Sequence, residues 1–444
     1  SGPHHFGPRP STHSLAFFGT RQHINMTPDT FAQLIVQQWL SDNGHRQALT
    51  ALEKEIGLLW DEDKLDRGGI LMDLVWSHME STSDDSPTDV HGAEEESLLR
   101  GGTGDYPQVV MHTIEGVHPT SVVCVRLLPG RDEVLTGSGD GIVRRVGFDA
   151  SLFWATPVGS GGALCLDLHP HLTSASWDQA EAGGVSSCLP CHVVAVGSMD
   201  GSLSLLHAYT GQLLASDRSH LKYVVRVAWA GDGQHLVTCS HDQSVGIHWV
   251  EVPQGGSDAP RAIITTVRKV EYLAAVQDVA FLPDGVSLCV AVRDTNYLRV
   301  LSFQHPESAE RLVNLNKGGD DHVSFFPRHL VPSPCGRFLL VSTDTERMLV
   351  LRTSDWTHTK YVLYSSPTQQ FHQPAAAWHK DSHYVMVSSV GGQVWVYHVG
   401  SGKVVAKIPV HKVNVRDIHY EKERNLLITC SFDKTVQVLG AKTM

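Results

Sequence analysis

One short pattern recurs after residue 130 and constrains the fold more than any other feature of the chain. Six times an apolar run ends in serine, any residue, then aspartate or glycine, and a second apolar run follows. These turns are Ser138–Asp140, Ser198–Asp200, Ser240–Asp242, Ser342–Asp344, Ser389–Gly391 and Ser431–Asp433. A seventh, Val292–Asp294, keeps the aspartate and lacks the serine. The third positions lie 60, 42, 52, 50, 47 and 42 residues apart, a period that predicts stacked supersecondary units.

Each unit has the same internal order of short β-rich stretches separated by turn residues. In the third unit His220 precedes YVVRVAWAGDG, HLVTCSHDQS and VGIHWVE, and in the last His411 precedes NVRDIHYEKE, NLLITCSFDK and TVQVLG. Over roughly Val109 to Met444 the chain resembles the WD-repeat family, whose pattern is four strands in about 40–45 residues. Seven turns therefore predict a mainly β fold, a seven-bladed β-propeller.

The chain departs from the family pattern at the tryptophan expected six residues after each turn aspartate. Those positions hold Val146, Leu206, His248, Val300, Val350, Tyr397 and Leu439. The family's buried His–Ser–Asp–Trp network should therefore be partial. The candidate sets are His118/Ser138/Asp140, His220/Ser240/Asp242 and His411/Ser431/Asp433. We interpret them as buried polar groups that satisfy one another rather than as catalytic or metal sites.

The order of strands also predicts how the ring closes. After Asp433 only one further strand fits before the sequence ends, so the last blade lacks its outer strand. The segment Val109–Gly116 is an unpartnered strand just before the first blade. Pairing it with the last blade would close the ring and remove the open edge.

Composition is that of an ordinary globular protein, with 41% hydrophobic and 18% charged residues. Of the net charge of −12, a charge of −10 lies between Asp61 and Glu96, where twelve residues are acidic and two are basic. This distribution disfavours nucleic acid as a partner, because phosphate neutralisation needs a positive surface. No apolar run approaches the length needed to cross a membrane. The eight cysteines lie mostly in apolar strand segments, which favours a cytoplasmic or nuclear location.

The amino-terminal region predicts a helical module at residues 26–80. Thr27-Pro28 suits a helix start, Gly44 ends that helix, and a second short helix follows. The string IVQQWLSDNGHRQALTALEKE resembles a lissencephaly-homology (LisH) motif, which implies homodimerisation. Two such helices cannot bury a core of their own, so we expect a dimer, with docking on the propeller as the alternative. The predicted dimerisation residues are Leu34, Ile35, Trp39, Leu40, Leu49 and Leu52.

The segments flanking this module have other compositions. Residues 1–25 predict a disordered leader or an added remnant, and 69–80 a third short helix. Residues 81–108 are rich in acid, serine and glycine, which predicts a flexible linker.

One cluster has the residue types of a metal site. His169, His171, Cys188 and Cys191 lie in or beside an insertion at residues 171–191 of the propeller, and His192 adjoins them. Histidine and cysteine are preferred zinc ligands, but a single CxxC pair with His-x-His is atypical. We expect no cofactor, and a metal-binding or catalytic propeller using residues 169–192 is the rival hypothesis.

Loops ahead of each blade's first strand predict the partner-binding face. They combine aromatic with basic residues, which could hold an acidic or phosphorylated peptide; plain surface charge and the chain's own acidic linker are the alternatives. The candidates are Lys222, Tyr223, Arg226, Arg328, Lys412, Asn414 and Arg416. We therefore expect a non-enzymatic dimeric scaffold within a larger complex. LisH–propeller proteins serve ubiquitin ligases, corepressors, splicing assemblies and motor regulators, and recruitment of ubiquitin-ligase substrates is the specific expectation.

Overall fold

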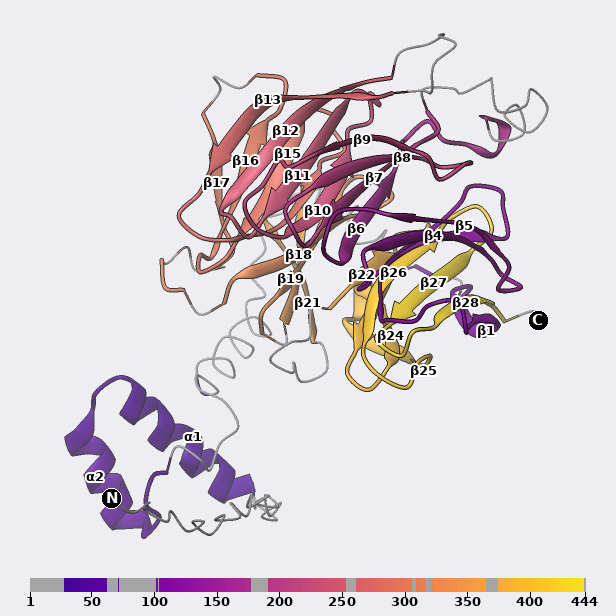
Figure 1. The fold of residues 1–444 in the computed structure, drawn as a ribbon. Coiled ribbons are helices and arrows are strands. Elements are labelled where there is room, and N and C mark those ends of the chain that lie inside the picture. The colour runs from indigo at the N-terminus through magenta and orange to yellow at the C-terminus, as the bar shows by residue number, and fades with distance from the viewer. Residues whose placement is uncertain are drawn as a thin grey trace, which may run out of the picture. The chain divides into compact units, whose positions relative to one another are not determined.

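A computed structural model shows two compact units, residues 1–88 and 89–444, each described below by itself (Figure 1). The structure describes residues 28–61, 71, 101–102, 104–176, 191–252, 261–305, 309–316, 319, 321–323, 325–345, 347–364 and 374–442. The predicted leader at 1–25 lies outside these residues. So do linker residues 81–100 and, except for Leu71, the predicted third helix.

The larger unit is a seven-bladed β-propeller, as predicted, and each blade is a four-stranded antiparallel sheet. Blade 1 contains β2 (Val122–Leu127), β3 (Glu133–Ser138), β4 (Ile142–Gly147) and β5 (Leu152–Pro157). Blade 2 contains β6 (Ala163–Leu168), β7 (Val193–Ser198), β8 (Leu203–His207) and β9 (Leu213–Asp217). Blade 3 contains β10 (Val224–Trp229), β11 (His235–Ser240), β12 (Ser244–Glu251) and β13 (Ile263–Glu271).

The remaining blades follow the same order along the chain. Blade 4 contains β14 (Val276–Phe281), β15 (Ser287–Val292), β16 (Tyr297–Ser302) and β17 (Arg311–Asn314). Blade 5 contains β18 (Pro327–Pro332), β19 (Phe338–Thr343), β20 (Arg347–Arg352) and β21 (His358–Tyr364). Blade 6 contains β22 (Ala376–Trp378), β23 (Tyr384–Ser389), β24 (Gln393–His398) and β25 (Lys403–Pro409), with a short 3-10 helix, η2 (Val399–Ser401), between the last two. Blade 7 contains β26 (Val415–Glu421), β27 (Leu426–Ser431), β28 (Val436–Ala441) and β1 (Pro107–Ile114).

Burial follows the position of a strand within its blade. Second strands such as β7 and β27 are buried at every residue, because neighbouring blades cover both of their faces. Outer strands such as β25 expose alternate residues. This explains why the second strands are continuously apolar in sequence whereas the outer strands alternate.

The recurrent turns connect the second and third strands, and their aspartates hold the turn closed. The Ser244 amide donates to the Asp242 carboxylate at 3.1 Å, and the Thr435 amide donates to Asp433 at 3.0 Å. Asp294 differs, because its turn is one residue longer and the residue itself has a φ of 60°. Its carboxylate accepts from Arg293 Nε at the long distance of 3.3 Å, and its side chain is 64% exposed. Without the serine, this turn does not reproduce the others.

The predicted ring closure is confirmed. Strand β1 pairs antiparallel with β28, with Val110 opposite Leu439 and Ile114 opposite Val436. Contacts begin even earlier than the predicted start at residue 109. Gly101, Gly104 and Asp105, assigned to the linker from composition, already hydrogen-bond to blades 6 and 7. Glycine-rich composition suggested flexibility, whereas here glycine permits close packing.

The smaller unit contains the two predicted helices. Helix α1 spans Pro28–Asp42, with the proline at its first position, and α2 spans Arg46–Ile56. Gly57 ends α2 in the left-handed region, where its amide donates to Glu53.

Ile114→Ala tests the importance of the closing strand. Ile114 is fully buried in the cluster shared by blades 7 and 1, so we expect a loss of about 2–5 kcal/mol in the free energy of unfolding. Val109→Ala in the same strand is the control, because Val109 is 44% exposed and its truncation should cost less than about 0.5 kcal/mol. Urea denaturation measures both. Equal midpoints for wild type and Ile114→Ala would show that closure does not depend on β1.

Candidate partner-binding face

One face of the propeller carries the turns between second and third strands and the loops between blades. We call it the turn face. Exposed large apolar side chains of the described propeller lie either on outer strands or on this face. On the turn face they are Met199, Leu221, Tyr223, Leu273, Val323, Val413 and Phe432. Leu221 is 80% and Leu273 is 98% exposed. Within the described residues, the opposite face shows none, so the two faces differ in chemistry.

Most predicted partner-binding residues lie on or beside the turn face. Lys222 and Lys412 are exposed, and Tyr223 packs beside His241 at a ring separation of 5.8 Å. Arg416 lies over the ring of Phe432 at 5.9 Å. These contacts stay within a blade or its leading loop.

Asn414 has a structural role in addition. Its side-chain oxygen accepts the Gly391 amide at 3.1 Å, which joins the loop before blade 7 to the turn of blade 6.

Arg328 is the predicted residue best suited to an anion. Its guanidinium lies 5.4 Å from the Phe326 ring, and its buried Nε–H has no hydrogen-bond partner in the described part of the chain. Burial lowers the pKa of Arg328 below its usual range although the Asp344 carboxylate opposes this shift, and Arg293 adds to the lowering. A carboxylate or phosphate would supply the missing acceptor and charge.

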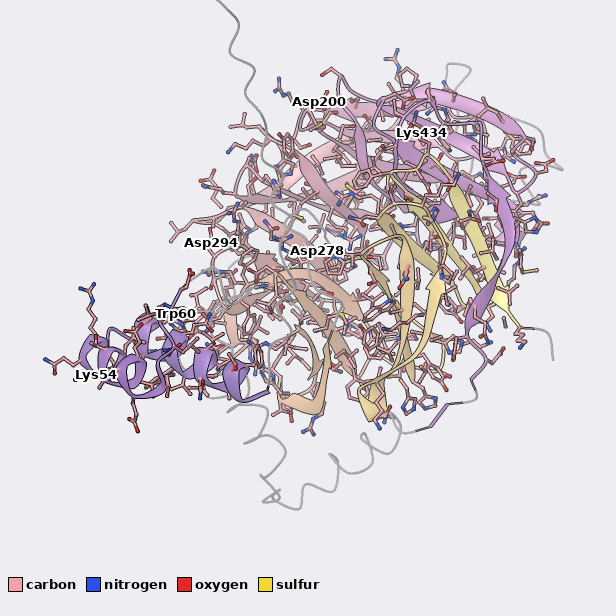
Figure 2. All side chains as sticks on the ribbon, turned by 90° about the horizontal axis from the view of Figure 1, so that it is seen from below. Lys54, Trp60, Asp200, Asp278, Asp294 and Lys434 are labelled. Atoms are coloured by element: carbon pink, nitrogen blue, oxygen red, sulfur yellow. The ribbon has the colours of Figure 1, made fainter. Side chains whose placement is uncertain are left out.

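Arg226 was predicted to contact a partner, but in the structure its guanidinium is engaged within the propeller. Its Nε donates to Asp278 at 2.7 Å, and its Nη2 lies 2.8 Å from His329 Nδ1. Asp278 is only 2% exposed (Figure 2). Although burial alone would raise it, Arg226 and His329 hold the pKa of Asp278 below its usual range. Arg226 thus belongs to the interior. Alternate residues of a strand point to opposite sides, and the prediction from loop position did not establish to which side Arg226 points.

Further carboxylates of the first strands link neighbouring blades, and the sequence reading missed them. The Val125 amide donates to Asp417 at 3.0 Å across blades 1 and 7, and Arg126 pairs with the same carboxylate at 2.8 Å. The Trp229 amide donates to Asp167 at 3.0 Å across blades 3 and 2. A signal was present, since these aspartates interrupt apolar strands, where an unpaired carboxylate would be costly.

Blade 3 contains the predicted histidine network in altered form. His220 Nδ1 lies 3.1 Å from the Asp242 carboxylate, but its Nε2 contacts Thr238, not Ser240, at 2.7 Å. Thr238 also contacts His248, which occupies the tryptophan position, at 2.9 Å. Burial, with the neighbouring His220, lowers the pKa of His248 to about 4, so this imidazole is uncharged at physiological pH, whereas the Asp242 carboxylate is ionised. Blade 7 repeats the first part with His411, Asp433 and Thr429.

The third predicted set, in blade 1, forms without its histidine: the Ser138 hydroxyl donates to Asp140 at 2.5 Å. Neither ring nitrogen of His118 has a hydrogen-bond partner within the described structure. Arg144 instead donates to Ser138 at 2.6 Å and to Asp140 at 2.7 Å. Burial and this arginine lower the pKa of His118 to about 4. A cation has taken the place that histidine holds in blades 3 and 7.

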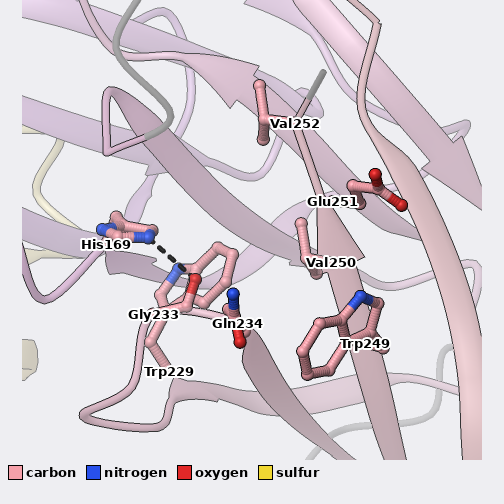
Figure 3. Close-up of a pocket in the computed structure, with 8 residues that line it drawn as sticks. All are labelled: His169, Trp229, Gly233, Gln234, Trp249, Val250, Glu251 and Val252. Atoms are coloured by element: carbon pink, nitrogen blue, oxygen red, sulfur yellow. Dashed lines mark hydrogen bonds between the residues drawn. The ribbon is translucent and has the colours of Figure 1, made fainter. Parts of the chain in front are cut away.

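The predicted metal cluster is not assembled by the described residues. His169 Nε2 bonds to the Gly233 carbonyl at 2.9 Å, and its Nδ1 accepts the His171 amide at 3.2 Å, so both ring nitrogens are engaged. Cys188 lies outside the described residues. Among the residues that are described, Cys191 included, no three metal-ligating side chains form a group that could hold a metal ion. His169 also borders a hollow of about 350 Å³ (Figure 3). Its lining is His169, Trp229, Gly233, Gln234, Trp249, Val250, Glu251 and Val252.

The predicted dimerisation residues fall into two groups. Leu34 and Ile35 are 1% and 3% exposed and pack within their own unit against Leu58, Trp60 and Leu71. Fewer of the predicted dimerisation residues are therefore exposed than expected. Residues after α2 cover these two side chains, and the prediction did not include them because it considered the two helices alone. The other four are partly exposed: Trp39, Leu40, Leu49 and Leu52.

Comparison with known proteins gives one family match. The family model described as WD domain, G-beta repeat matches residues 211–248 and 402–438, which contain parts of blades 3 and 7. No curated protein matches the chain as a relative. Among the described helices, none is long and apolar enough to span a membrane.

Arg226→Met tests whether this arginine is structural. It would leave the buried Asp278 carboxylate without its main partner, so we expect a loss of about 3–5 kcal/mol in unfolding free energy. Adding Asp278→Asn should recover part of the loss, because the amide oxygen still accepts from Leu330. Arg416→Met is the control and should change stability by less than about 1 kcal/mol. Denaturation showing equal stability for Arg226→Met and Arg416→Met would contradict the assignment.

Proposed function

Because the chain is a seven-bladed β-propeller that carries WD40 repeats, we propose that it is a non-enzymatic adaptor that binds a protein partner on the turn face. The observation that carries the proposal is the segregation of exposed apolar side chains. Leu221 and Leu273 are almost fully in solvent, on the loops before and after blade 3. Solvent-exposed leucines add nothing to the core, and apolar residues gathered on one face mark interaction surfaces.

The chemistry of the partner follows from the basic residues on the same face. Within the described residues the Nε–H of Arg328 lacks an acceptor, and Lys222 and Lys412 are exposed close to the apolar loops. We propose a partner segment that combines apolar side chains with aspartate, glutamate or phosphate. The binding set consists of Lys222, Tyr223, Arg328, Lys412, Asn414 and Arg416. Arg226 is removed from it by its internal ion pair.

We propose further that the amino-terminal module makes the protein a dimer, so that two propellers bind bivalently. Partly exposed Trp39, Leu40 and Leu52 on α1 and α2 support this. Recruitment of substrates to a ubiquitin ligase is the specific role proposed, from the resemblance to LisH–propeller proteins. Corepressor, splicing and motor-regulator assemblies are the alternatives. The described cysteines are free thiols, which supports a cytoplasmic or nuclear location.

The double variant Leu221→Asp/Leu273→Asp tests the partner face. Affinity purification with the wild type identifies the partner, and Kd is then measured with purified proteins. Each charged group would be placed in an apolar contact, so we expect at least a tenfold loss of affinity. The matched control is Leu213→Asp/Leu312→Asp, two leucines of similar chemistry, 46% and 52% exposed on outer strands β9 and β17. Equal loss in both double variants, or none in the first, would move the site away from the turn face.

Leu40→Asp/Leu52→Asp tests the dimer. We expect the wild type to scatter light as twice 48.6 kDa and the variant as a monomer, because a buried carboxylate opposes packing of the two modules. Gln47→Glu, a charge added at an exposed position of α2, should leave the dimer intact. A monomeric wild type at micromolar concentration would refute dimerisation and leave the partner-face proposal untouched.

A further inference from the structure

Blade 6 has the shortest first strand among the described blades. Strand β22 has three residues, whereas the first strands of the other six blades have six or seven. Its residues Ala376 and Ala377 carry no charge, so β22 offers no carboxylate of the kind that joins blade 7 to 1, 2 to 3 and 4 to 5. Toward blade 5 it is held by Trp378, whose indole N–H donates to Val331 at 2.8 Å. Its joint with blade 7 is formed instead by a shared apolar cluster and by contacts outside the first strands.

Residues 101, 102 and 104–106, which we call the strap, contact both sides of that joint. On blade 6, the Gly101 carbonyl accepts from His398 Nε2 at 2.8 Å, and the Gly104 amide donates to the Tyr384 hydroxyl at 3.1 Å. His398 Nδ1 accepts the Ser401 amide, which assigns the donating proton to Nε2.

On blade 7, the Asn425 side chain donates to the Asp105 carbonyl at 2.9 Å. The Asn425 side-chain oxygen accepts from the Tyr420 hydroxyl at 3.0 Å, which fixes the orientation of the Asn425 amide. Tyr106 completes the strap, with its ring 5.0 Å from that of Tyr384, inside the apolar cluster shared by blades 6 and 7.

Glycine is required where the strap lies closest to blade 6. A Cβ on Gly101 would come within 2.9 Å of the His383 ring, and one on Gly102 would lie 2.5 Å from the Tyr384 hydroxyl. Gly102 also has a φ of 145°, which side-chain-bearing residues rarely adopt. The surface formed by His383, Tyr384, His398 and Asn425 thus fits a glycine-rich extended segment.

We propose that the strap is a latch, which holds blade 6 against blade 7 on the face opposite the turn face. It binds at the strand ends remote from the recurrent turns, since Tyr384 begins β23, His398 ends β24 and Asn425 precedes β27. The strap continues directly into β1, so one stretch of chain both closes blade 7 and secures blade 6. Release of the strap loosens a joint whose opposite side, the Gly391–Asn414 contact, belongs to the turn face.

Hydrogen exchange of the full chain, read by mass spectrometry, tests the latch with Gly102→Ala. The added methyl group collides with Tyr384, so we expect amide exchange at least threefold faster in the peptides covering 104–114 and 376–409. Blade 3, residues 224–271, should keep its wild-type rate. Tyr384→Phe, which keeps the ring and removes the acceptor for the Gly104 amide, should give a smaller change in the same peptides.

The matched control is Gly116→Ala. Gly116 has a φ of 78°, so alanine is strained there too, but its Cβ would meet nothing within 4 Å. We expect no acceleration in residues 376–409 for this control. Wild-type exchange at the joint in both strap variants would overturn the proposal. Faster exchange spread equally over all blades would overturn it as well, because the strap would then serve general stability rather than one joint.

Discussion

The propeller depends on carboxylates buried near its axis. Asp417, Asp167 and Asp278 each accept a backbone amide from the first strand of the next blade, and two of them are also neutralised by arginine. A buried carboxylate is stabilising only when its partners are in place, so each contact requires the neighbouring blade. Since Asp417 contacts Val125 across the boundary between blades 7 and 1, it couples the two ends of the repeat array independently of β1.

Much of the fold could be predicted because it rests on local chemistry. The turn aspartates bond to amides two residues ahead, which fixes their spacing in sequence, and the unpaired strand before blade 1 matched the missing strand of blade 7. Predictions failed where a partner comes from elsewhere in the ring. His220 of blade 3 contacts Thr238 rather than Ser240, and in blade 1 Arg144 takes the contacts expected for His118. Both choices depend on cross-strand neighbours that spacing along one strand does not specify.

The sequence indicated on which face the candidate residues lie better than it indicated the direction of each side chain. Loop position places Lys222 and Tyr223 correctly, because loops between blades can lie only at the ends of the strands. Arg226 lies in β10, two residues inside the strand. There a shift of one residue along the strand moves a side chain to the opposite side of the sheet, so position in sequence alone did not show that Arg226 points into the ring. Leu273 was missed altogether, since an isolated leucine in a loop carries no periodic signal.

The two faces of the ring differ in how much stability a substitution at an exposed loop tip costs. Turn aspartates such as Asp433 satisfy their own turns, so the exposed Phe432 between Ser431 and Asp433 contributes little to the fold. On the opposite face, contacts such as Arg424 with the Arg131 carbonyl tie neighbouring blades together. Substitution at the tips of the turn face therefore costs little stability, whereas the same change on the opposite face loosens the ring. Leu273, which is 98% exposed, is free of the packing that constrains core residues, so its side chain can meet the needs of the proposed partner.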